Sequence, residues 1–195
     1  MAGRRSIGRV SSDPSVVTQA IAVAEQLSVE CSTLLELYKQ KESFTSEVAD
    51  SRLVSVPHPS AQLDSGDKLW SLHMALLQCR GLMKRAVERE EKELGSEKNG
   101  SYEGQRRVVK ERLSLLVGRT AEILKAVKGA AAAPPSLAEP EWDGSSTFEL
   151  KVWVFRVFKE VDYWTKATIT TLKSLSKSKE PVAASRNRSD RNGYR

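Results

Sequence analysis

Two long helical patterns are joined by a connector of only seven residues, 95–101, which reads GSEKNGS. Apolar residues recur at helical spacing through about 67–94 before it and through 101–128 after it. A helix of ~28 residues is about 42 Å long at ~1.5 Å per residue, whereas such a connector reaches at most about 25 Å. Because the connector cannot return along a helix, the two helices must be antiparallel neighbours.

Two further helical patterns, at about 14–42 and 147–175, are separated from this pair by long connectors. Residues 43–66 and 129–146 are rich in Ser, Pro, Ala and Gly, and each is long enough to run the length of a helix. Long, short and long connectors are typical of an all-α, long-chain four-helix bundle with up-up-down-down topology and two long crossover loops. Cap signals agree, since Ser146 and Glu149 form a capping-box pattern and Gly95 suits a left-handed helix end.

The surplus positive charge lies at the two ends of the chain. Of a formal net charge of +6 over 195 residues, residues 1–12 supply +3 and residues 176–195 supply +4, so the body is close to −1. We expect a basic flexible N-terminus over 1–13, a bundle over 14–175 and a disordered basic tail over 176–195. A nucleic-acid-binding protein would carry a basic stripe on its folded surface, so we expect no nucleic-acid partner.

The chain shows no membrane-spanning pattern, because no run approaches ~20 apolar residues. Its first residues, MAGRRSIGRVSSDPSVV, contain basic side chains but no apolar h-region, so we expect no conventional signal peptide. Cys31 and Cys79 both fall on apolar helical stripes. They are best read as two buried thiols, with a single disulfide bridge as the alternative.

An enzyme is not indicated. The two histidines are His58, expected in a solvated loop, and His73, expected at the flank of the second helix. Neither has partners for nucleophilic or metal chemistry, and no glycine-rich phosphate loop is present. The run VEREEKEL in the second helix reads as a solvated face with i,i+4 ion pairs. We therefore expect no catalytic residues, cofactor or metal.

The fourth helix presents two phenylalanines opposite its apolar arc. On a helical wheel, Phe148 and Phe155 fall among lysines such as Lys151, whereas Trp153 and Phe158 flank the apolar arc and are expected to pack in the core. Aromatic rings among lysines favour a partner-binding surface. The alternative is that the preceding long loop covers the two rings.

The fourth helix also carries a family resemblance. FELKVWVFRVFKEVDYWTKATITTLKSL has the Phe-x-x-Lys pair Phe148/Lys151, then Trp153, then Trp164-Thr165. It resembles the last helix of the ciliary neurotrophic factor and cardiotrophin branch of the interleukin-6 cytokines. LLELYKQKESF is similar, more weakly, to the end of that family's first helix. The resemblance implies a neurotrophic-type helical cytokine that brings cell-surface receptors together to trigger JAK-STAT signalling.

The resemblance also implies three receptor-binding surfaces. The Phe-x-x-Lys pair would contact the leukaemia inhibitory factor receptor, and we include the neighbouring Phe155 in this set. Outward positions of the first and third helices would contact the shared interleukin-6 signal transducer: Ala22, Gln26, Val29, Thr33, Val108, Glu111 and Leu115. Positions late in the fourth helix would contact a ciliary neurotrophic factor alpha receptor: Lys166, Thr170 and Lys173.

The sequence departs from the family pattern in the alpha-receptor region. Ala167 stands where the family tends to place an arginine, and the tryptophan expected late in the first long loop has no clear counterpart, since Trp70 lies inside the second helix. We expect a cytoplasmic protein that is released to the extracellular space without a conventional signal peptide. The alternative is an intracellular helical-bundle adaptor or scaffold.

Overall fold

Four long helices make up most of the computed structural model, which describes residues 14–44, 52–60, 62–95, 100–128 and 146–177. The expected N-terminal segment, the connector at 129–145 and the tail beyond 177 lie outside the described residues. The helices are α1 (Pro14–Glu42), α2 (Ser65–Glu93), α3 (Ser101–Lys128) and α4 (Thr147–Lys177). Their bounds lie close to the ranges that the apolar spacing predicts.

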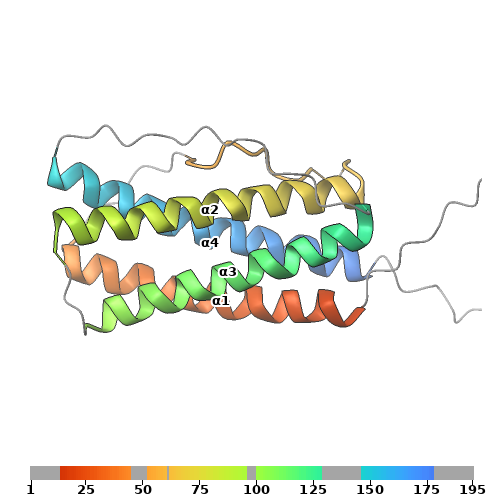
Figure 1. Cartoon of the computed structure of the whole chain (residues 1–195), viewed down its shortest axis with the longest axis horizontal. Coiled ribbons are helices and arrows are strands. Elements are labelled where there is room, and N and C mark those ends of the chain that lie inside the picture. The colour runs from red at the N-terminus through yellow and green to blue at the C-terminus, as the bar shows by residue number, and fades with distance from the viewer. Residues whose placement is uncertain (1–13, 45–51, 61, 96–99, 129–145, 178–195) are drawn as a thin grey trace, which may run out of the picture.

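The helices form one bundle in which α1 and α2 run in one direction and α3 and α4 run in the other (Figure 1). Both α1 and α2 pack against α3 and α4, so that every contacting pair is antiparallel. This arrangement confirms the predicted up-up-down-down bundle. No helix among the described residues combines the length and apolar character needed to cross a membrane.

The predicted caps are present. The Ser146 hydroxyl accepts from the Glu149 amide at 3.2 Å, and the Glu149 carboxylate accepts from the Ser146 amide at 3.3 Å, which is a reciprocal capping box. Asp64 caps α2 by accepting from the Asp67 amide at 2.8 Å. Gly95 has a φ of 78°, as a left-handed helix end requires.

The core joins all four helices. Both cysteines are buried in it and are not bonded to each other, which confirms the interpretation as two buried thiols. Trp153 and Phe158 are buried as predicted. The position expected for His73 at a helix flank is wrong, because this residue is buried at the contact between α2 and α3 with Nδ1 2.9 Å from the Thr120 hydroxyl.

A second correction concerns Glu90 in the run VEREEKEL, for which the sequence pattern predicts a solvated face. Glu90 is buried, and its Oε2 accepts from the Tyr102 hydroxyl and from Arg106 Nη1, each at 2.7 Å. Its Oε1 accepts from Lys41 Nζ at 3.1 Å. This carboxylate therefore ties α1, α2 and α3 together at one end of the bundle.

Residues 52–60 of the first crossover lie against α4 and α2. The buried Glu160 carboxylate accepts from the Leu53 amide at 3.4 Å and from Trp164 Nε1 at 2.9 Å. The Arg52 guanidinium lies 3.4 Å from the ring centroid of Tyr163. His58 is exposed, as expected, although its ring stacks on Trp164 with 6.0 Å between centroids. This part of the crossover is therefore attached to the bundle.

Candidate functional site

Phe148 is an exposed aromatic residue in the first turn of α4. Its side chain is 66% exposed, although α4 buries most of its other large apolar residues. The capping box at Ser146 and Glu149 fixes where the helix begins, and so fixes the position of this ring. An exposed ring on a rigid helix start can fill a pocket in a partner with little loss of conformational entropy.

Lys151 lies one helical turn further along and is held by the end of α1. Its Nζ pairs with the Glu42 carboxylate at 2.5 Å, and its backbone carbonyl accepts from the Tyr38 hydroxyl at 3.3 Å. The lysine side chain is 33% exposed, whereas that of Glu42 is 5% exposed. A partner at this surface would therefore meet mainly the Lys151 side chain and little of the Glu42 carboxylate.

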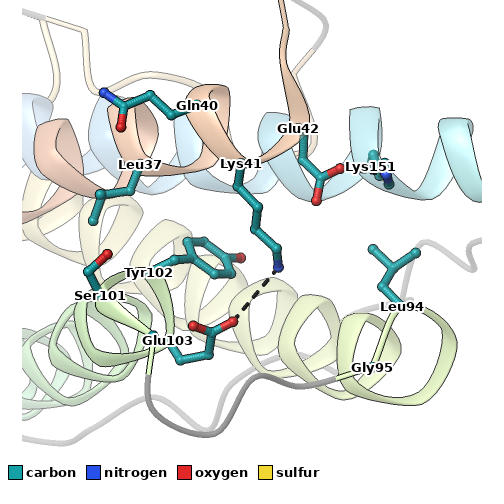
Figure 2. Close-up of a pocket in the computed structure, with 11 residues that line it drawn as sticks. Leu37, Gln40, Lys41, Glu42, Leu94, Gly95, Ser101, Tyr102, Glu103 and Lys151 are labelled. Atoms are coloured by element: carbon teal, nitrogen blue, oxygen red, sulfur yellow. Dashed lines mark ion pairs between the residues drawn. The ribbon is translucent and has the colours of Figure 1, made fainter.

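A hollow of about 600 Å³ adjoins Lys151 at this end of the bundle. Leu37 and Leu94 form part of its lining, and Lys41 extends across it toward Glu103 (Figure 2). The Lys41 ammonium lies 4.3 Å from the ring centroid of Tyr102 and 3.8 Å from the Glu103 carboxylate. The hollow therefore offers apolar walls together with charges that are already paired.

The exposure predicted for Phe155 is wrong. Phe155 is 4% exposed and packs against Phe44, which follows α1, with 5.5 Å between ring centroids. The helical wheel places it beside Phe148 because the two are seven residues apart. A wheel does not show which neighbouring segment packs against the helix at each position along its axis. Phe155 belongs to the core, and the surface at the start of α4 consists of Phe148 and Lys151.

The predicted surface on α1 and α3 is largely exposed. Val29 is 68% exposed and Leu115 is 45% exposed, whereas Val108 is half-buried. The remaining members are exposed: Ala22, Gln26, Thr33 and Glu111. Between the two helices, Arg112 pairs with Glu30 at 2.8 Å. This ion pair fixes α1 against α3, and with it the relative positions of Val29 and Leu115.

The three predicted positions late in α4, Lys166, Thr170 and Lys173, are all exposed. Lys166 pairs with Asp162 at 2.7 Å, and Lys173 pairs with Glu25 of α1 at 2.6 Å. Because the two lysines are exposed, their ammonium groups remain accessible to a partner.

Sequence reasoning missed the hollow and the role of α1 beside Lys151. From the sequence, Tyr38 is a member of the apolar stripe, and Glu42 appears only within the segment LLELYKQKESF, which is similar to the end of the family's first helix. The helical periodicity of α1 places Tyr38 and Glu42 on one side, four residues apart, but nothing in the sequence connects them with a residue more than a hundred positions away. Among the described residues, no group of three or more His, Cys, Asp or Glu side chains could hold a metal ion.

Comparison with known protein families identifies the chain. The family model of ciliary neurotrophic factor matches residues 9–190, which is nearly the whole sequence. A search among proteins of curated function found no match. The matching family consists of neurotrophic cytokines, which bind cytokine receptors outside the cell and are not enzymes. This match favours the cytokine interpretation over the intracellular adaptor. The four-helix bundle and the family match together show that the chain belongs to the ciliary neurotrophic factor family.

Proposed function

We propose that this neurotrophic cytokine binds the leukaemia inhibitory factor receptor through Phe148 and Lys151. The observation that carries the proposal is the 66% exposure of Phe148 at the capped start of α4. Large aromatic residues at the centre of an interface commonly supply much of its binding energy. Lys151 adds a charge within one helical turn of the ring, as the Phe-x-x-Lys pair of the family would.

The shared interleukin-6 signal transducer is the proposed partner of the α1 and α3 surface. Val29 and Leu115 are two of the few large apolar side chains that the described residues expose. They flank the Arg112–Glu30 ion pair, so the surface combines apolar side chains with a fixed polar contact. The proposed contacts are Ala22, Gln26, Val29, Thr33, Val108, Glu111 and Leu115.

A ciliary neurotrophic factor alpha receptor is the proposed partner of the surface late in α4. Lys166, Thr170 and Lys173 offer two accessible ammonium groups and a hydroxyl along one exposed side. Ala167, where the family tends to carry an arginine, is buried, so this chain offers one basic group fewer there. We propose that the two lysines carry the charge recognition of this surface. The expected release without a signal peptide stays a prediction.

Binding at separate faces gives the proposed mechanism. A rigid bundle holds two signalling receptor chains at a fixed separation, so that their associated kinases phosphorylate each other and start JAK-STAT signalling. Once one receptor is bound at the membrane, binding of the next is favoured by its high effective concentration. Weak contacts on different faces therefore act together.

The test is binding of the purified chain to the leukaemia inhibitory factor receptor ectodomain. We expect the Phe148→Ala/Lys151→Ala variant to lose at least about a hundredfold in affinity, since two anchor contacts are removed. Its circular dichroism should remain that of the wild type. A Lys166→Ala variant is the matched control, because it removes an exposed lysine from another part of α4. Failure of the folded wild type to bind the receptor would refute the proposal.

A further inference from the structure

The last turns of α1 hold Lys151 by two independent contacts. The Glu42 carboxylate pairs with the Lys151 ammonium at 2.5 Å, and the Tyr38 hydroxyl donates to the Lys151 carbonyl at 3.3 Å. Tyr38 and Glu42 are four residues apart, so they lie on the same side of α1. One contact fixes the backbone of α4 at Lys151 and the other fixes the end of its side chain.

Glu42 and Lys151 differ in how far their side chains are exposed, and this difference gives them different roles. The Glu42 side chain is 5% exposed, so it offers a receptor far less contact area than the Lys151 side chain does. An ammonium group has three N–H donors, so pairing with one carboxylate does not use all of them, and 33% of the Lys151 side chain is exposed. Figure 2 shows Glu42 and Lys151 side by side at the edge of the hollow.

Lys151 pairs with Glu42, whereas the neighbouring Lys41 pairs with other carboxylates. Lys41, the residue just before Glu42, is turned to the other side of the hollow, where it pairs with Glu90 at 3.1 Å and with Glu103 at 3.8 Å. A carboxylate that is largely removed from water is stabilised by a nearby cation. The pairing within the bundle therefore favours one arrangement of the Lys151 side chain.

We infer that Glu42 is a positioning residue of the receptor-binding surface, acting by holding the Lys151 side chain in one arrangement, three residues along α4 from Phe148. The inference rests on the proposed binding of Lys151 to the leukaemia inhibitory factor receptor. A free lysine side chain loses much rotamer freedom when it is fixed in an interface. Because Glu42 restricts that freedom before the receptor arrives, less is lost on binding. The surface is thus made jointly by the end of α1 and the start of α4.

The test is a double-mutant cycle on binding to the receptor ectodomain, with the variants Glu42→Gln, Lys151→Met and both together. Glu42→Gln keeps the shape of the side chain but removes its charge, and we expect it to weaken binding roughly tenfold. In the Lys151→Met background it should have less than about a twofold effect, since no ammonium group remains to be positioned. Glu36→Gln, an exposed glutamate on the same helix, should bind like the wild type.

The outcomes separate this inference from the proposed function. If Lys151→Met weakens binding but Glu42→Gln binds as well as the wild type or better, the positioning role is refuted and the proposed site stands. An equal loss from Glu42→Gln in both backgrounds would assign it a general structural role and also refute the inference. If the folded wild type does not bind the receptor, both proposals fail. Glu42→Asp, which keeps the charge on a shorter side chain, should recover part of the affinity lost in Glu42→Gln.

Discussion

Phe44 lies over Phe155 with 5.5 Å between ring centroids, and it reaches that position because Ser43 adopts a φ of 52°. The left-handed residue ends α1 and lets the Phe44 amide donate to the Lys39 carbonyl at 3.1 Å, as in a Schellman-type helix end. The chain thereby folds back onto α4. The contact with Phe44 helps to bury Phe155, whereas Phe148 is exposed.

The two phenylalanines should therefore respond differently to truncation. Phe155→Ala should lower the free energy of unfolding by about 3–5 kcal/mol, since it leaves a cavity between α1 and α4. Phe148→Ala should change it by no more than about 0.5 kcal/mol, because the ring is mostly in solvent. Urea denaturation followed by circular dichroism measures both values. Similar losses for the two variants would show that Phe148 is also a packing residue.

The different environments of these rings show what can and cannot be predicted from the sequence. Helix ranges, caps and topology follow from local patterns and connector lengths, so the sequence alone predicts them. The burial of Phe155 and Glu90 and the pairing of Glu42 with Lys151 depend on which residue of another helix lies opposite at each height. Helical periodicity gives direction around one helix, and it carries no information about that register.

Glu90 offers a second test of stability. Glu90→Ala should destabilise the protein by about 3–5 kcal/mol, because it leaves the buried Arg106 guanidinium without its closest carboxylate. Burial raises the pKa of Tyr102 well above its usual range, and the neighbouring Glu90 raises it further, so this phenol stays a neutral hydrogen-bond donor. Glu88→Ala, which removes an exposed glutamate from the same helix, should change stability by less than about 0.5 kcal/mol. A similar loss in both variants would contradict the assigned network.

Glu160 should control attachment of the first crossover. The amide of Glu160→Gln has only one good acceptor oxygen for the Leu53 amide and Trp164 Nε1, so one of these hydrogen bonds should be lost. The loss should lower the free energy of unfolding by about 1–3 kcal/mol. Faster amide hydrogen exchange across residues 52–60 would report the loosening. Glu122→Gln, an exposed change on α3, serves as the control. Unchanged exchange in Glu160→Gln would mean that other contacts hold the crossover.

The α1 and α3 surface can be tested apart from the start of α4. Val29→Asp and Leu115→Asp should each weaken binding to the shared signal transducer about tenfold or more, because they place a charge within an apolar contact. Neither should affect folding, since both side chains are exposed. Leu63→Asp is the matched control, an exposed leucine just before α2. Equal binding by all three variants and the wild type would remove this surface from the proposed function.

His73 should make stability depend on pH. Burial, together with the positive charge of Arg80, lowers the pKa of His73 below its ordinary value. Because the unfolded chain then binds the proton more readily than the folded chain, stability is fully present above about pH 6.5 and is lost as the pH falls through the folded pKa. Thermal unfolding between about pH 5 and 8 should show this loss in the wild type and a smaller loss in His73→Asn. An unchanged pH dependence in His73→Asn would show that other groups cause the loss.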